Sequence, residues 1–103
     1  MTATLLVLYN PPTDAAAFDA YYAGVHTPLA KTLPGLLELN VSCGPIATPA
    51  GPAPYHLIAA LRFDSLAGIA AALASPEGQA TAGDLGNFAS GGATILLYET
   101  RTC

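Results

Sequence analysis

Four short apolar runs alternate along the chain with two helix-forming segments, and this order most constrains the fold. Turn residues bound the runs, which is typical of strands. They span Thr4 to Tyr9, Leu36 to Cys43, Tyr55 to Phe63 and Ala93 to Thr100. The resulting βαββαβ order predicts an α+β, ferredoxin-like fold in which an antiparallel sheet carries two helices on one face. We expect residues 1–103 to form a single domain.

The first helix is expected to begin at Asp14, a residue type that caps helices well, and to stop at Pro34-Gly35. Its buried stripe should follow helical spacing. That stripe would consist of Phe18, Tyr21, Val25 and Leu29. Pro28 lacks a backbone donor and disfavours helix at the residue before it, so we expect a kink or break near His26–Thr27.

The second helical segment is less uniform than the first. Leu66 to Ala74 is rich in alanine and leucine, which predicts a helix. Ser75-Pro76 ends this helix or starts another, and the segment from there to Phe88 predicts a short, weak helix or an ordered loop. Gly44 to Pro54 is rich in glycine and proline and predicts a surface loop.

The strands are apolar on both faces, which a sheet with one solvated face would not show. The first strand contains Leu5 to Leu8 in succession, and the last contains Ile95 to Tyr98. Only 10% of the residues are charged, against about 25% in a typical soluble domain. We therefore expect a second copy of the chain to cover the helix-free face, which gives a homodimer through the sheet.

The charge balance argues against several classes of partner. Three Lys and Arg residues against seven Asp and Glu residues give a net charge of −4. Nucleic acids and anionic membrane surfaces both bind through Lys and Arg, so we expect neither. The N-terminal segment lacks a positive region and its apolar run ends at Asn10-Pro11, so we expect no signal peptide and a cytoplasmic location.

Metal and cofactor signals are weak in this sequence. The two cysteines, Cys43 and Cys103, and the two histidines, His26 and His56, have no partner at ligand spacing. No glycine-rich dinucleotide or phosphate loop is present. We therefore expect no metal site and no cofactor, and the sequence leaves the roles of His56, Cys43 and Cys103 open.

Several motifs occur together in one order along nearly the whole chain. The motif residues are Tyr21, Tyr22, His26, Pro28 and Leu29, then Pro34 to Leu36, Phe63 to Ser65, Ala72 to Gly78, and Asp84, Asn87 and Phe88. This set resembles the EthD-like family, named for ethyl tert-butyl ether degradation. The resemblance implies a dimeric α+β barrel of two ferredoxin-like protomers. The wider superfamily includes cyclases, isomerases, cofactor-free monooxygenases and haem-using enzymes, so the fold does not determine the reaction.

Tyr22 and His26 are the first candidate catalytic residues, because their four-residue separation places them on one face of the predicted helix. An imidazole can donate and accept protons near neutral pH, so His26 is the candidate acid or base. Tyr22 would orient it or hydrogen-bond a substrate oxygen. The resemblance implies a ligand cavity between the helices and the sheet. The alternative is structural: His26 caps the broken helix or bonds a carbonyl freed by Pro28.

Three further residues are candidate substrate contacts. Asn87 and Phe88 match the family pattern near the end of the second helical region, and the Asn87 amide can donate to a carbonyl oxygen. Tyr9 ends the first strand, where pockets in such sheets often open. Asp84 is expected to be a helix cap or a surface residue, and His56 is expected to face an interface or solvent.

Together these residues predict binding of a small, largely apolar, oxygenated molecule. The first hypothesis is a cofactor-independent lyase, isomerase or cyclase in which His26 transfers a proton. The second is a non-catalytic accessory or binding homodimer in an oxidative degradation pathway. A cofactor-free monooxygenase is a third and weaker hypothesis.

Overall fold

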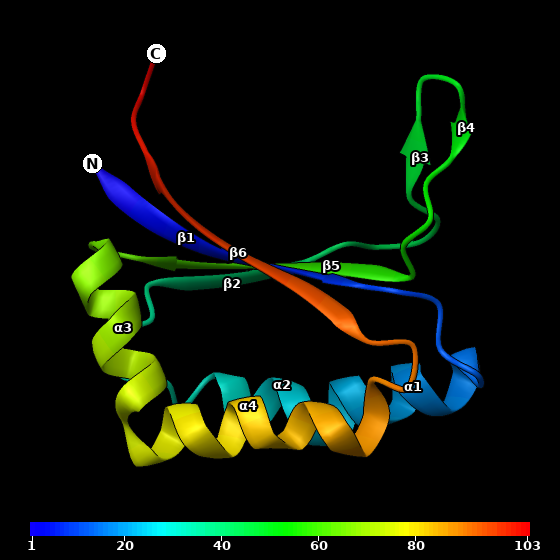
Figure 1. The fold of residues 1–103 in the computed structure, drawn as a ribbon, viewed down its shortest axis with the longest axis horizontal. Helices are drawn as coiled ribbons and strands as arrows, with labels where there is room; N and C mark the ends of the chain where they lie inside the picture. The colour runs from blue at the N-terminus through cyan, green and yellow to red at the C-terminus, as the bar shows by residue number, and fades with distance from the viewer.

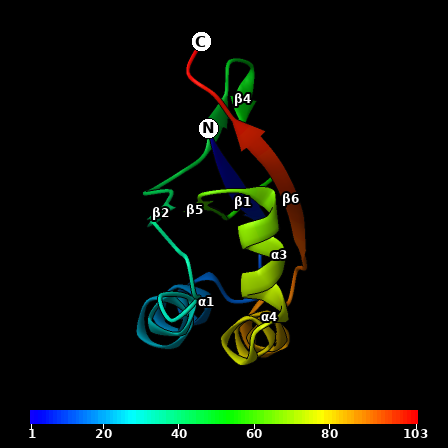
Figure 2. The same cartoon turned by 90° about the vertical axis from the view of Figure 1, so that its left-hand side faces the viewer.

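The computed structural model describes residues 1–103 and contains a four-stranded antiparallel sheet with all helices on one face (Figure 1, Figure 2). The strands are β1 (Thr2–Tyr9), β2 (Glu38–Val41), β5 (Leu57–Phe63) and β6 (Ala93–Thr100), in the order β2-β5-β1-β6. This is the ferredoxin-like βαββαβ arrangement, so the predicted fold class is confirmed. None of the helices has the length and apolar character needed to cross a membrane.

One continuous helical segment follows β1. It comprises α1 (Ala15–Tyr21), the π-helical turn η1 (Tyr22–His26) and α2 (Thr27–Ala30). Asp14 caps its start, because its side chain accepts a hydrogen bond from the Ala17 backbone amide at 3.0 Å. The chain does not break near His26–Thr27, since both residues keep helical backbone angles, but the regular α-helix is interrupted there by the π turn that ends at His26. The wide π turn accommodates Pro28, whose ring would clash with the preceding turn of an α-helix.

The π turn also changes which side chains of this segment are buried. The buried side consists of Phe18, Tyr22, His26 and Ala30. The predicted stripe is therefore wrong beyond Phe18: Val25 is 46% exposed, and Tyr21 and Leu29 are only half-buried. An α-helix has about 3.6 residues per turn, so side chains four residues apart shift gradually around the helix axis. The wider π turn compensates for this shift and keeps these side chains on the same side of the segment.

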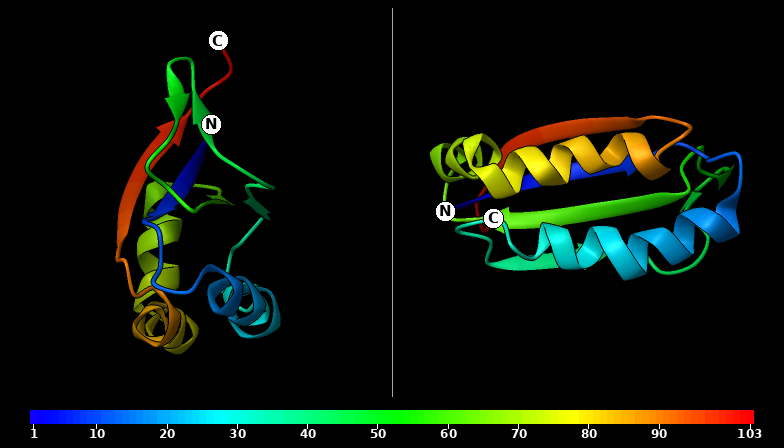
Figure 3. Two further views of the ribbon diagram at one scale, coloured as in Figure 1. Left: turned by 90° about the vertical axis from the view of Figure 1, so that its right-hand side faces the viewer. Right: turned by 90° about the horizontal axis from the view of Figure 1, so that it is seen from below.

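The second helical segment contains α3 (Leu66–Ala74), as predicted, and α4 (Pro76–Phe88). α4 has 13 residues, so the prediction of a short helix or loop is wrong. Ser75 caps α4 by accepting from the Gly78 amide at 3.0 Å, and Pro76 suits the first helical position. α4 lies beside the first helical segment beneath the sheet (Figure 3), while α3 stands at one end.

The segment between β2 and β5, predicted as a surface loop, contains a two-stranded hairpin of β3 (Ala47–Thr48) and β4 (Gly51–Pro52). The hairpin projects from the helix-free side of the sheet (Figure 1). It therefore extends away from the core.

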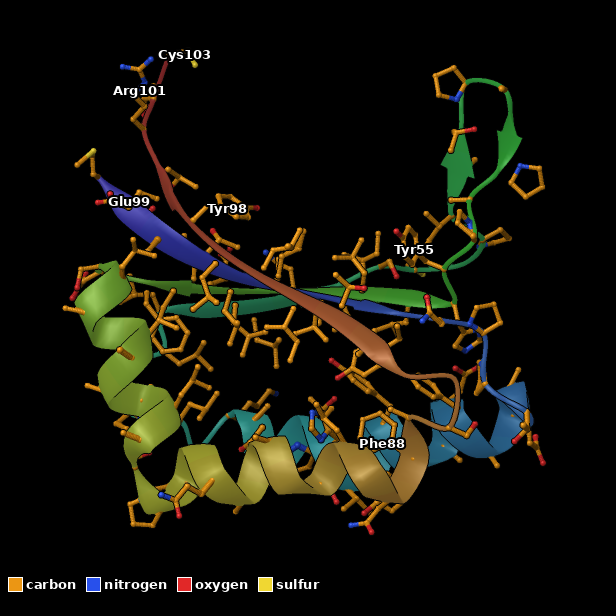
Figure 4. All side chains as sticks on the ribbon, viewed as in Figure 1. Tyr55, Phe88, Tyr98, Glu99, Arg101 and Cys103 are labelled. Atoms are coloured by element: carbon orange, nitrogen blue, oxygen red, sulfur yellow. The ribbon has the colours of Figure 1, made fainter.

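The two faces of the sheet differ in their surroundings. Alternate residues of β1 and β5 point toward the helices and form the core between the sheet and the helices, including the buried Leu5 and Leu61. On the other face, Leu6 lies opposite Leu96 in the register of β1 with β6. Leu96 is 48% exposed and Tyr98 is 42% exposed, and Tyr98 projects away from the helices (Figure 4). Within one protomer this apolar face is open.

Candidate functional site

An apolar cavity of about 200 Å³ lies between the sheet and the helices. Every strand of the main sheet and each helical segment contributes to its wall. Of its 15 lining residues 13 are hydrophobic, and the other two are His26 and Thr81. An apolar cavity with few polar groups is typical of small-molecule sites. The cavity lies where the family resemblance implied.

His26 forms a hydrogen-bonded pair with Asp84 of α4. His26 Nδ1 lies 2.9 Å from Asp84 Oδ2, and the side chains are 5% and 8% exposed. An ionised carboxylate has no proton to donate, so Nδ1 carries the proton and Nε2 carries the lone pair. No other group of the protein bonds Nε2. Every fully buried polar side-chain atom has a hydrogen-bond partner, so the unpartnered Nε2 is not fully buried. His26 therefore lines the cavity and carries a proton acceptor that no other group of the protein bonds.

Asp84 is held by two further donors. Its Oδ1 accepts from the Tyr21 hydroxyl at 2.5 Å and from Asn87 Nδ2 at 2.9 Å. Burial raises the pKa of this carboxyl, but the hydrogen bonds from Tyr21, Asn87 and His26 outweigh burial and lower the pKa below its usual value. Asp84 is therefore ionised at neutral pH, and its position fixes the orientation of the imidazole.

Tyr9 and Tyr22 line the cavity beside His26. The ring centroids of Tyr9 and Tyr22 are 5.7 Å apart, and those of Tyr22 and His26 are 5.4 Å apart. Neither hydroxyl bonds another group of the protein, and both reach open space. Burial raises the pKa of Tyr22 to about 12. Burial, and then the nearby Tyr22 and Asp84, also raise the pKa of Tyr9. Both phenols are therefore protonated donors at neutral pH.

The structure brings some of the predicted site residues together and separates others. Tyr9, Tyr22 and His26 share the cavity. Phe88 packs against the His26 ring, with centroids 4.6 Å apart, and belongs to the aromatic cluster between α4 and the sheet (Figure 4). Asn87 lies outside the cavity and contacts Asp84. His26 bonds a carboxylate, and it neither caps the helix nor bonds a backbone carbonyl, which were the two forms of the structural alternative.

Asp84 is the residue whose role was assigned wrongly from the sequence. It is neither a cap nor a surface residue, because it is 8% exposed and bonds three side chains. A signal was present: Asp84 and Phe88 are four residues apart and share one face of a helix. Only the contact across 58 positions reveals its place beside His26.

His56, the second histidine, lies outside the cavity. Its Nε2 is 2.7 Å from Asp19 Oδ1, at the edge of a separate open cleft beside the hairpin. Its ring meets Phe18 edge to face, with centroids 4.9 Å apart. The expected solvent-facing role is compatible with this position.

The fold is that of a ferredoxin-like α+β protein with an apolar cavity between the sheet and the helices. A family model described as the EthD domain matches residues 10–92. A Rhodococcus erythropolis protein, described as an uncharacterized 11.0 kDa protein in the thcB-thcC intergenic region, is 39% identical over 97 residues, or 93% of this chain and 92% of the relative. The chain belongs to the EthD domain family.

A solved structure agrees with this assignment. An EthD family protein from Bacillus halodurans is 30% identical, with a TM-score of 0.89 over 98% of this chain and 100% of the other. SnoaB, a cofactor-independent oxygenase from Streptomyces nogalater, is 16% identical, with a TM-score of 0.67 over 99% and 95% of the two chains. The second likeness shows a shared fold alone.

Proposed function

We propose that the cavity binds a small, largely apolar, oxygenated molecule and that His26 transfers a proton to or from it. The observation that carries this proposal is the open Nε2 of His26 at the wall of an apolar cavity. A general base needs a lone pair within reach of the proton that it removes. The proposed class is a cofactor-independent lyase, isomerase or cyclase, since proton transfer by a side chain needs no bound group.

Asp84 acts in this proposal as a positioning residue. It holds the proton on Nδ1, which leaves Nε2 as the acceptor, and its charge stabilises the imidazolium that forms when Nε2 takes a proton. Tyr21 and Asn87 hold the carboxylate in place by donating hydrogen bonds to its other oxygen, Oδ1. Tyr22 is placed to hydrogen-bond the ligand oxygen.

The test compares His26→Gln with His56→Gln, which changes the same residue type outside the cavity. Calorimetry uses three probes that share one carbon frame: indane, 2-indanol and 2-indanone. We expect indane to bind the wild type and both variants equally. 2-Indanol, whose hydroxyl can donate to Nε2, should lose roughly 10-fold in affinity in His26→Gln alone, the equivalent of one hydrogen bond. 2-Indanone has no proton to donate to Nε2 and should bind both variants alike. The proposal fails if no probe binds, or if both variants bind 2-indanol alike.

A non-catalytic binding homodimer is the second candidate. The open apolar face of the sheet favours the formation of a dimer. Leu96 and Tyr98 on this face are exposed within the protomer, and exposed apolar patches mark interaction surfaces. Two proteins of the same fold are described as dimeric. The apolar cavity serves binding in this candidate without any proton transfer.

Sedimentation velocity at micromolar concentration tests the dimer. The wild type should sediment as a dimer, and Leu96→Glu should give a monomer because it places a charge in the interface. Val25→Glu changes an equally exposed apolar residue on a helix and should remain dimeric. A monomeric wild type would rule out the sheet-to-sheet assembly.

A further inference from the structure

Three lining residues of the cavity, in neighbouring rings, carry hydrogen-bonding atoms that bond no other group of the protein. These atoms are Nε2 of His26 and the hydroxyls of Tyr9 and Tyr22. The Thr81 hydroxyl, which also lines the cavity, is already used, because it donates to the Glu77 carbonyl at 2.8 Å. The cavity therefore offers a ligand one acceptor and two donors.

The lining excludes a ligand with a permanent charge. No Lys, Arg, Asp or Glu side chain lines the cavity, and burying an unpaired charge is costly. Two neutral donors beside one base instead suit a neutral molecule on which negative charge develops during the reaction.

We infer that Tyr9 and Tyr22 together bind an oxyanion, and that the substrate is a small apolar ketone, or related carbonyl compound, with an acidic hydrogen on the neighbouring carbon. This inference rests on the proposed function of His26 and adds the chemical class of the substrate. It also makes Tyr9 a catalytic residue alongside Tyr22.

The proton transfer balances with these groups alone. The C–H bond next to the carbonyl breaks, and its proton forms a bond with His26 Nε2. The electron pair becomes the C=C bond of an enolate, and the carbonyl π pair moves to the oxygen, which accepts hydrogen bonds from Tyr9 and Tyr22. The imidazolium then returns the proton to the same carbon or to a conjugated one. No oxidant or reductant is consumed.

The protonation states of the phenols agree with this role. Burial raises the pKa of both hydroxyls, so they donate to the enolate oxygen without losing their own protons at neutral pH. Donors that are already in place at the developing charge lower the barrier more than mobile water does.

Deuterium uptake at the α carbon of 2-indanone, followed by proton NMR in D₂O, tests the inference. The variants are Tyr9→Phe and Tyr22→Phe, which keep the rings. The control is Tyr55→Phe, a tyrosine at the foot of the hairpin and outside the cavity (Figure 4). We expect wild type and Tyr55→Phe to accelerate uptake equally. Each cavity variant should slow it by about 10²-fold, the usual effect of removing one oxyanion donor.

Parallel calorimetry separates failure of the inference from failure of the proposed function. If indane and 2-indanone bind but uptake does not exceed that of buffer, or both phenylalanine variants keep the wild-type rate, the oxyanion assignment is overturned while the cavity and His26 remain. If neither probe binds, the proposed function fails and the inference falls with it. Unchanged indane affinity in the slow variants shows that the cavity is intact and supports the assignment.

Discussion

The molecule contains two histidine–aspartate pairs whose surroundings differ. His26 and Asp84 join α4 to the π turn at 2.9 Å, and both side chains are buried. His56 and Asp19 are closer, at 2.7 Å, but their side chains are 22% and 59% exposed. Asp84 accepts two further hydrogen bonds, whereas solvent reaches most of Asp19. The shorter contact is thus the one that water competes with.

This difference shows that residue types and distance do not by themselves make a site. The buried pair has a fixed tautomer, a supporting network and a neighbouring cavity. The exposed pair borders an open cleft where water can replace either partner. Changes made in parallel to both pairs therefore test the comparison.

The largest expected effect is on stability. Asp84→Ala removes the acceptor of three side-chain donors and leaves the buried Nδ1 of His26 unpaired. We expect it to lower the free energy of unfolding by about 3 kcal/mol. Asp19→Ala should cost less than about 1 kcal/mol, because its partner is accessible to water. Urea denaturation measures both, and equal losses would contradict the comparison.

The second effect is a dependence of stability on pH. The folded-state pKa of Asp84 lies below its ordinary value of 3.8, because hydrogen bonds outweigh burial. Its ionised form therefore contributes stability that is present above that value and is lost as the pH falls through the folded pKa. The difference in free energy of unfolding between wild type and Asp84→Asn should be constant near neutral pH and decrease below pH 3.8. An increase of this free-energy difference in acid would contradict the assignment.

The smallest expected effect comes from Tyr21, which supports the buried pair from outside. Tyr21→Phe removes one of the three donors to Asp84, so the pKa of the Asp84 carboxyl should rise toward its ordinary value. Carbon-13 NMR of the labelled carboxyl measures this shift. Tyr98→Phe, on the opposite face of the sheet, is the matched control and should leave the titration unchanged. If the two variants titrate alike, Tyr21 does not support the pair.

Much of the fold was predictable, because it follows from local patterns. The short apolar runs with turn residues between them determined the order of strands and helices along the chain. The phase of the first helical segment was not predictable in the same way. An α-helical period was assumed, and the π turn at Tyr22–His26 placed His26 in place of Val25 on the buried side.

Only the part of the candidate site that lies within one helical segment was predictable from the sequence. Tyr22 and His26 are one turn apart, so their proximity follows from the sequence. The contact between His26 and Asp84 depends on how α4 packs beside the first helical segment, which no local pattern specifies. A single carboxylate on a helix is usually solvated, and this expectation led to the wrong assignment of Asp84.

The central claim is that Asp84 holds His26 in the tautomer with the proton on Nδ1 and the open acceptor at Nε2. A long-range proton–nitrogen correlation spectrum of the ¹⁵N-labelled protein at neutral pH measures this tautomer directly. We predict a protonated Nδ1 and an unprotonated Nε2 for His26, and loss of this fixed pattern in Asp84→Ala. A proton on Nε2 of neutral His26 would contradict the account, because the cavity would then face a donor in place of a base.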